Sequence, residues 1–250
     1  MAVRAHIPST LRVEDLTLTV FAPTYFLAML KETLHGWSIV PGDDGVEPDI
    51  MVIHEAEYIQ TDARIHAAPL RRTDPIHALN DFFLTLAYLY ANHHSRWELV
   101  HCAAISREGR NVLLLGDKKS GKSVMAIRHG VGGHGFIADD LLLWNTSRGV
   151  FKTIGLPPRL RRPVMDEIIR RTAADAFFAG KDLAYMKVGR YNGVPAAQII
   201  EFDEVRRVKS GAEIEKISLL NYASEIRSRV VSKSYMEFAK PTLTLSMDRS

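Results

Sequence analysis

The chain has 250 residues, of which 46% are hydrophobic and 24% are charged, and its formal net charge is +3. This composition predicts an ordinary globular protein and excludes a largely disordered one. The single cysteine, Cys102, excludes an intramolecular disulfide, and the lack of any Cys-x-x-Cys pair excludes a zinc ribbon. A reducing, cytoplasmic location fits this cysteine usage.

Neither a membrane nor a nucleic acid is expected as a partner. The first twenty residues have no continuous apolar segment, and the longest apolar run, residues 82–90, is too short to span a bilayer. The small net charge does not argue for DNA binding, although residues 152–171 hold six Lys or Arg against two acidic residues. That basic segment is equally compatible with a solvated helix face. The sequence is also compatible with a homo-oligomer.

The N-terminal part of the chain predicts a small α/β region. Residues 16–21 alternate between apolar and polar side chains like a strand, and residues 48–55 are typical of a buried strand. Between them, apolar residues at helical spacing predict a helix with Thr24 as its N-cap and Gly36 just past its end. The polar stretch after residue 55 has no strong period.

A long helix is expected next, from Asp74 as N-cap and Pro75 in the first turn through residue 94. This helix would pack the small N-terminal α/β region, residues 1–72, against a larger region, residues 73–250. No internal repeat or low-complexity tract interrupts either region.

The larger region contains a complete Gly-x-x-x-x-Gly-Lys-Ser motif that ends at Ser123. Two apolar runs, residues 97–106 and 111–116, are joined by Arg-Glu-Gly-Arg and predict a hairpin that leads into the motif. The residues after the motif are compatible with a helix. A phosphate-binding loop needs this strand, loop and helix context.

Each part of the motif has a physical role in binding phosphate. Gly116 and Gly121 permit backbone conformations that turn N–H groups inward, Lys122 can reach the β and γ phosphates, and the Ser123 hydroxyl can bind Mg²⁺. The alternative is a degenerate loop that keeps the fold and binds nothing. The predicted nucleotide-binding residues are Gly116, Asp117, Lys118, Lys119, Ser120, Gly121, Lys122, Ser123 and Val124.

Two carboxylates, Asp139 and Asp140, begin only sixteen residues after Ser123. That distance holds one short helix, a Gly-rich turn and one strand, without the extra strand and helix that many P-loop ATPases and GTPases insert. A strand that ends at this pair would bring one carboxylate near the metal and the other near the terminal phosphate, where it could orient or deprotonate a hydroxyl nucleophile. The alternative is that one Asp, more readily Asp140, faces solvent or caps a turn.

Four segments in this order resemble the C-terminal kinase domain of HPr kinase/phosphorylase and its smaller relatives: "VHCAAIS", the loop itself, "GFIADD" and "IGLPPRLR". The resemblance covers residues 97–165. It continues more weakly through "AAQIIEFDEV" and "EKISLLNYASEI", where relatives have a strand and a closing helix. It implies an α/β fold, with an HPr kinase/PEP carboxykinase-like P-loop core of mixed sheet and helices beside the small N-terminal α/β region.

The resemblance also implies roles for individual residues. Asp139, His101 and Lys122 would be catalytic, with Asp139 as the general base, while Ser123 and Asp140 would bind the metal. ATP and Mg²⁺ are the implied cofactors. Taken alone, a histidine inside an apolar strand such as His101 is just as compatible with a core residue.

The chain departs from HPr kinases in two segments. The loop has Lys118 and Lys119, and Val124 where HPr kinases have Glu, while prolines 157 and 158 stand where that family would meet its protein substrate. Smaller relatives, which include kinases of free serine and of serine in lasso peptides, resemble the chain better. The expected function is an ATP-dependent phosphotransferase that acts on a hydroxyl, expected to be serine, of a peptide or small molecule.

Several alternatives stay open at the level of sequence. The chain could instead be a kinase of an HPr-like protein, or a nucleotide-sensing module that transfers no phosphate. Arg159, Arg161 and Arg162 could clamp an anionic group or lie on an exposed surface. The other histidines, including His93 and His94, show no ligand spacing with acids or cysteines, so no metal site beyond nucleotide-bound Mg²⁺ is predicted.

Overall fold

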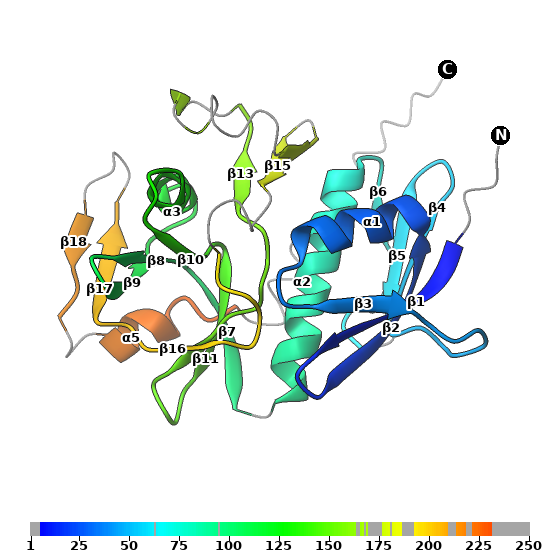
Figure 1. The fold of residues 1–250 in the computed structure, drawn as a ribbon, viewed down its shortest axis with the longest axis horizontal. Coiled ribbons are helices and arrows are strands. Elements are labelled where there is room, and N and C mark those ends of the chain that lie inside the picture. The colour runs from blue at the N-terminus through cyan, green and yellow to red at the C-terminus, as the bar shows by residue number, and fades with distance from the viewer. Residues whose placement is uncertain are drawn as a thin grey trace, which may run out of the picture.

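The computed structural model is a mixed α/β fold with several sheets and few helices (Figure 1). It describes residues 6–62, 64–94, 96–163, 166–167, 169, 177–180, 182–186, 193–209, 214–218 and 222–231. Parts of two segments considered above, Arg170 with Arg171 and residues 219–221, lie outside the described residues. Within the described part of the chain, no helix has the length and apolar character needed to cross a membrane.

A six-stranded sheet and two helices make up the N-terminal part. The elements are β1 His6–Val13, β2 Leu16–Pro23, α1 Thr24–Thr33, β3 Ser38–Pro41, β4 Ile50–His54, β5 Tyr58–Asp62, β6 Leu70–Arg72 and α2 Pro75–His93. The strand order is β3-β1-β2-β4-β5-β6, with β2 and β4 parallel and the other neighbours antiparallel. Leu11, Leu18 and Ile50 of the sheet share one core with Phe26 of α1 and Phe82 of α2.

Helix α2 lies between this sheet and the rest of the chain (Figure 1). The Asp74 side chain caps the helix and accepts hydrogen bonds from the backbone N–H groups of Ile76 and His77, at 2.7 and 3.1 Å. Most of the helix is buried, and its core also includes Leu99 and Leu141. A helix that is apolar all round must be covered on all sides. One core therefore spans the predicted boundary at residue 72.

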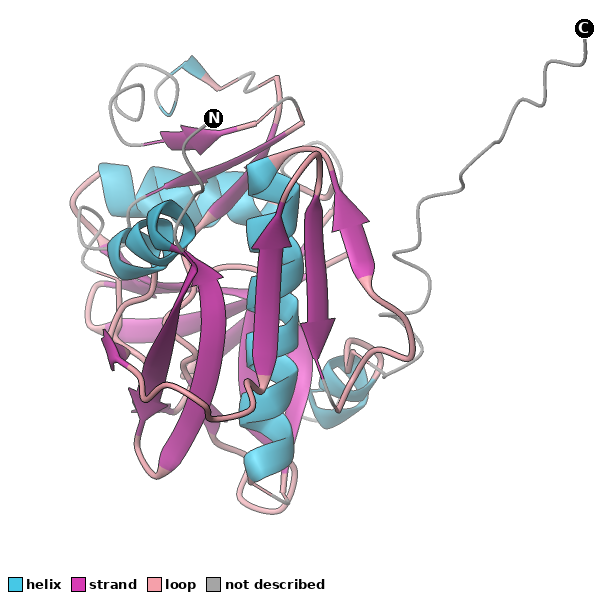
Figure 2. Cartoon of the chain, turned by 90° about the vertical axis from the view of Figure 1, so that its right-hand side faces the viewer, coloured by secondary structure: helices cyan, strands magenta, loops and turns pink. Residues whose placement is uncertain are grey.

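Two larger sheets, a three-stranded sheet and short helices follow along the chain. Their elements are β7 Trp97–His101, β8 Ala103–Arg107, β9 Arg110–Leu115, α3 Lys122–Val131, β10 Gly135–Ala138, β11 Leu141–Asn145, β12 Phe151–Lys152, β13 Arg159–Arg161, β14 Phe177–Ala179, β15 Leu183–Met186, β16 Ile199–Ile200, β17 Glu204–Val208, β18 Ile214–Lys216 and α5 Tyr222–Arg227. The sheet orders are β10-β8-β9-β17-β18, β16-β12-β11-β7 and β13-β15-β14. In Figure 2 α2 runs behind strands of the N-terminal sheet. Helix α3 packs on the first of these sheets through Ala126 and Ile127.

The predicted hairpin before the loop is confirmed with one correction. Strands β8 and β9 pair antiparallel around Glu108 and Gly109, whose φ angles of 54° and 77° are those that a two-residue hairpin turn needs. The prediction of one strand over residues 97–106 is wrong, because the chain divides at Cys102. Strand β7 joins β11 in one sheet, whereas β8 joins β9 and β10 in another. Buried apolar residues lie on both sides of Cys102, so the two strands look like one continuous strand in the sequence.

Several further elements differ from the sequence-based expectation. Strands β1, β5 and β6 are present although the sequence pattern does not predict them, because their partly buried positions weaken the alternation of polar and apolar residues. Helix α1 begins at Thr24 with Pro23 at the N-cap position, and no side chain caps it. Thr24 is therefore the first helical residue rather than the cap.

Candidate functional site

The Gly116–Ser123 loop connects β9 to α3, as the sequence predicts. Gly116 has a φ of 153°, and a Cβ atom there would lie 2.4 Å from the Val208 carbonyl oxygen of the neighbouring strand. Gly121 has a φ of 102° at the N-cap position of α3, a left-handed conformation that favours glycine. No side chain caps α3. The N–H groups at the positive end of this helix thus border the loop.

Lys122 folds back into the loop. It is 5% exposed, and its Nζ donates hydrogen bonds to the carbonyl oxygens of Gly116 and Asp117, at 2.9 and 3.1 Å. Burial lowers the pKa of Lys122, and the nearby Asp139 acts in the opposite direction. A buried ammonium group that is held by backbone carbonyls, rather than by a carboxylate, is well suited to an anionic oxygen.

Asp139 lies in the turn between β10 and β11, where the chain passes from one sheet to the other. Its carboxylate is 2% exposed, and Oδ2 accepts a hydrogen bond from the Arg159 backbone N–H at 2.9 Å. The nearby Ser123 side chain acts to lower the pKa of this carboxyl. Among the described residues, Oδ1 has no hydrogen-bond partner. Burial and the neighbouring Asp140 raise the pKa of Asp139 to about 6.

Asp140 has a left-handed backbone, with a φ of 71°, and its side chain lies beside Arg159 and His101. Its Oδ1 accepts a hydrogen bond from Arg159 Nη2 at 2.5 Å and lies 3.4 Å from His101 Nε2. Burial acts to raise the pKa of Asp140, but Arg159 and His101 outweigh burial and lower it to about 2. The two adjacent carboxylates therefore shift in opposite directions.

Arg159 is itself held by α2. Its Nη1 donates to Asn80 Oδ1 at 2.7 Å, and the Tyr185 hydroxyl donates to the same oxygen at 2.9 Å. The predicted arginine cluster is thus divided: Arg159 and the exposed Arg161 line the cavity beside the loop, whereas Arg162 does not. Arg162 donates to the Gly180 carbonyl oxygen at 2.9 Å.

Two cavities border the loop, and both have the size of a small-molecule site. The first has a volume of about 540 Å³ and is lined by His101, residues 118–124, Asp140 and Arg159, together with Leu160, Arg161, Pro163 and Asp166. The second, of about 630 Å³, shares four loop residues with the first and is otherwise lined by Met125, Arg128, His129, Gly132, His134, Val208 and Ile214. The loop therefore borders two cavities, each large enough to hold a separate bound group.

Most of the predicted site residues come together here. His101, the loop from Lys118 to Val124, and Asp140 line one cavity. Gly116 and Asp139 lie just behind that surface, where they contact Ser120 and Ser123 respectively. Asp117 is exposed and pairs with Arg229 Nη1 at 2.6 Å, so its side chain turns toward the C-terminal end of the described chain.

Three residues that complete the site have no signal in the sequence. Asn80 holds Arg159, Tyr185 holds Asn80, and Arg229 holds Asp117. Each is more than 70 residues from its partner, so no local spacing could reveal them. The sequence pointed to Arg159 only as one of three arginines that could clamp an anionic group, without giving its partner.

No protein-family model matches this chain. No curated protein matches it either. The resemblance to the HPr kinase/phosphorylase family consequently rests on the sequence motifs alone.

Proposed function

We propose that this protein is an ATP-dependent kinase with an HPr kinase-like P-loop core, which transfers the γ-phosphoryl group to a hydroxyl, expected to be serine, of a peptide or small molecule. The observation that carries the proposal is the convergence on one loop of a buried lysine, an uncapped helix start and two carboxylates. Phosphoryl transfer depends mainly on positioning and electrostatic stabilisation, and these groups supply both.

Lys122 and the start of α3 would bind the phosphates. Among the described residues, Lys122 donates only to carbonyl oxygens of its own loop, which phosphate oxygens can replace as acceptors. The N–H groups of an uncapped helix favour the same anionic oxygens. Ser120 supports this assignment, because its Oγ is buried and has no hydrogen-bond partner among the described residues.

Ser123 and Asp139 fit a magnesium site, which reverses the roles that the family resemblance implies for the two carboxylates. Loop serines and a nearby aspartate share the metal in P-loop proteins, and Asp139, not Asp140, is the carboxylate whose pKa the nearby Ser123 side chain lowers. Its unpartnered Oδ1 also suits a cation. Mg²⁺, when bound, would neutralise charge on the phosphates.

Asp140 would orient the acceptor hydroxyl, because it lines the cavity and Asp139 does not. Arg159 and His101 fix its carboxylate, so it is a positioned acceptor for the hydroxyl proton. The transfer forms a bond from the hydroxyl oxygen to the γ phosphorus, breaks the bond from that phosphorus to the ADP oxygen, and moves the hydroxyl proton to Asp140. Because the transition state is loose, orientation matters more than the basicity of Asp140.

The acceptor class is a separate part of the proposal. The family resemblance favours free serine or a serine of a ribosomally made peptide such as a lasso peptide, in the cytoplasm, over an HPr-like protein. The alternative is a nucleotide-sensing module, which would bind ATP at the same loop and transfer nothing.

The test measures binding and transfer separately. Calorimetry with Mg-ATP gives affinity, and labelled ATP mixed with free serine or a serine-ended peptide gives transfer. Asp140→Asn should lower transfer by roughly a hundred- to ten-thousand-fold while leaving Mg-ATP affinity nearly unchanged. Asp139→Asn should weaken Mg-ATP binding and transfer together, since a metal partner acts on both.

Glu108→Gln is the matched control, because it removes one exposed carboxylate at the far end of the hairpin that leads into the loop. It should behave like the parent. If the two Asp variants exchange phenotypes, the roles are those that the family resemblance implies. Binding of Mg-ATP without transfer to any acceptor would favour the sensing module, and no binding at all would refute nucleotide recognition.

A further inference from the structure

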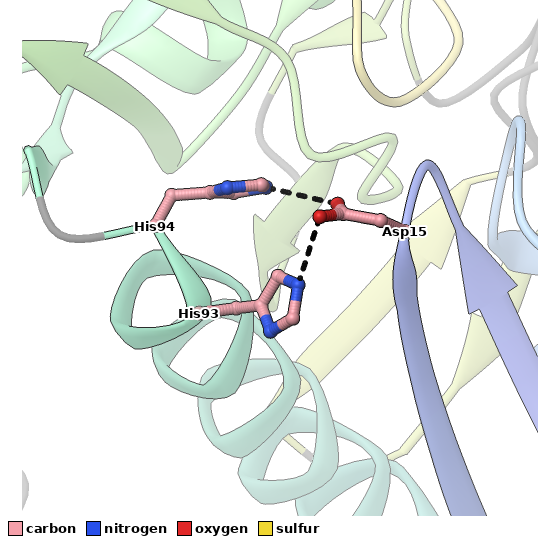
Figure 3. Close-up of side chains that lie close together, drawn as sticks. All are labelled: Asp15, His93 and His94. Atoms are coloured by element: carbon pink, nitrogen blue, oxygen red, sulfur yellow. Dashed lines mark ion pairs between the residues drawn. The ribbon is translucent and has the colours of Figure 1, made fainter.

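Three side chains outside the loop region form a second cluster of ligand-type groups: Asp15, His93 and His94 (Figure 3). Asp15 lies in the hairpin between β1 and β2, and the two histidines lie at the C-terminal end of α2. His93 is thirteen residues beyond Asn80, about 20 Å further along the helix. Sequence spacing did not identify the cluster, because Asp15 is 78 residues before His93.

The distances in the cluster match those around a small metal ion. His93 Nε2 lies 3.4 Å from Asp15 Oδ2, and His94 Nε2 lies 3.7 Å from Asp15 Oδ1. All three ligand atoms lie within 4.8 Å of one another. These separations are longer than N–H···O hydrogen bonds, which are about 2.7–3.2 Å. Two ligands of a tetrahedral zinc ion are about 3.3 Å apart, given bonds of about 2.0–2.2 Å.

The backbone brings two consecutive histidines to the same side. His93 is the last residue of α2, and His94 has an extended backbone, with φ −115° and ψ 108°. The two rings are 4.9 Å apart between centroids and inclined by 75°. In Figure 3 both point toward the Asp15 carboxylate. The negative end of the helix dipole also favours a cation here.

The polar atoms around the cluster leave a place for an ion. His94 Nε2 is buried and has no hydrogen-bond partner among the described residues. Glu14 lies 3.4 Å from that nitrogen, but Lys152 and Tyr90 hold its carboxylate at 2.8 and 2.7 Å. Glu14 therefore offsets the charge of Lys152 and suits an outer partner of the site rather than a ligand.

We propose that Asp15, His93 and His94 bind one zinc-class divalent transition-metal ion, with water as a fourth ligand. Two imidazoles and one carboxylate suit zinc, cobalt or nickel, whereas magnesium prefers oxygen ligands. The side chain of Asp15 is 72% exposed, which leaves the ion a path from solvent. The ion would fix the β1–β2 hairpin to the end of α2, so its role is to stabilise the N-terminal sheet against the helix.

Calorimetry with ZnCl₂, visible spectroscopy with Co²⁺ and thermal unfolding test the site on the full chain. The parent should bind one ion, and Co²⁺ should give the visible bands of a tetrahedral complex. At a free zinc concentration about 100 times the Kd, Tm should rise by roughly 5–10 °C. Asp15→Asn and His93→Ala should weaken binding by more than the ten- to hundred-fold loss that an outer partner causes.

His77→Ala is the matched control, because His77 is a similarly exposed histidine on the same helix, with one carboxylate at 3.4 Å and no second histidine beside it. It should keep zinc binding and the Tm increase. The proposal fails if the parent binds neither Zn²⁺ nor Co²⁺, or if Asp15→Asn and His93→Ala bind as the parent does. Unfolding of the metal-free variants shows whether any loss reflects misfolding instead.

Discussion

Helices α2 and α3 begin in opposite ways: a side chain caps the first, whereas the second borders a cavity. The start of α2 is closed by Asp74, whose carboxylate accepts two backbone N–H groups. The start of α3 has Gly121 at the cap position and no side-chain cap. The chain satisfies its own N–H groups at α2 and leaves them beside a cavity at α3.

Buried carboxylates differ in the same way. Asp81 on α2 is bound by Arg72 through Nε at 2.6 Å and Nη2 at 3.2 Å. Asp139 near α3 accepts a hydrogen bond from the Arg159 backbone N–H, and its other oxygen has no partner among the described residues. A buried carboxylate without full compensation costs stability. The cost in stability at Asp139 would be offset if a bound cation supplied the missing positive charge.

The largest expected effect comes from Lys122→Ala. Loss of the buried ammonium should weaken Mg-ATP binding by roughly a hundredfold or more, because each charge-assisted hydrogen bond contributes about 1.5–3 kcal/mol and Lys122 would make two. Calorimetry measures this change. Lys31→Ala, which removes an exposed cation from α1, is the control and should bind normally. Equal affinity of parent and Lys122→Ala would show that the loop does not bind phosphate.

On the structural side, Arg72→Ala should lower the free energy of unfolding by about 3–5 kcal/mol, because it leaves Asp81 buried without its partner. The adjacent Arg71 pairs with Glu57 on the surface. Arg71→Ala should therefore cost at most about 1 kcal/mol. Urea unfolding of both variants tests the contrast, and similar losses would contradict it.

The Asp139 and Asp140 pair predicts a pH dependence of the ligand-free protein. The folded pKa of Asp139 is raised from 3.8 to about 6, so its stabilising contribution is present below pH 4 and is lost as the pH rises through 6, by about 3 kcal/mol. The folded pKa of Asp140 is lowered to about 2, so its contribution is present above pH 4 and is lost as the pH falls through 2. Together they contribute most near pH 4.

Unfolding of the parent and Asp139→Asn across this range isolates the Asp139 contribution. The variant should lack the decline between pH 4 and pH 6 and be the more stable protein at pH 7. Parallel curves for the two proteins would mean that burial does not raise the pKa of Asp139.

The smallest effect is expected at the α2 cap. Asp74→Ala removes two hydrogen bonds to backbone N–H groups and should cost about 1 kcal/mol of unfolding free energy. Thermal unfolding measures it. Asp74→Ser, which keeps an acceptor at the cap, should recover most of the loss, and its failure to do so would assign the effect to another contact of Asp74.

The sequence predicts those parts of the fold and of the site in which residues that are close in space are also close in the chain. The loop, α3, β10 and the Asp pair fall within 25 residues, so glycines, lysine and acids at fixed spacing predicted their order. The hairpin turn at Glu108 and Gly109 is equally local. The sequence did not show the division of residues 97–106 at Cys102, because buried apolar residues lie on both sides of it.

Contacts across the chain could not be predicted. Arg159 reaches Asn80 over 79 positions, and Asp15 meets two histidines that follow it by nearly 80 residues. Periodicity describes which face of an element is buried, but not which polar side chain lies opposite. The structure confirms the mixed α/β class that the sequence pattern predicts. The roles proposed for Asp139 and Asp140 depend on contacts that the sequence does not show.

The position of α2 has a consequence for how the protein can be divided. One side of this helix covers the N-terminal sheet, and Asn80 holds the arginine that fixes Asp140. A chain cut after residue 72 would expose Phe82 and Leu86 to water, so the fragment should aggregate before its activity could be assayed. Because the two parts share a helix, ligand bound at the loop should also protect the distant sheet from proteolysis.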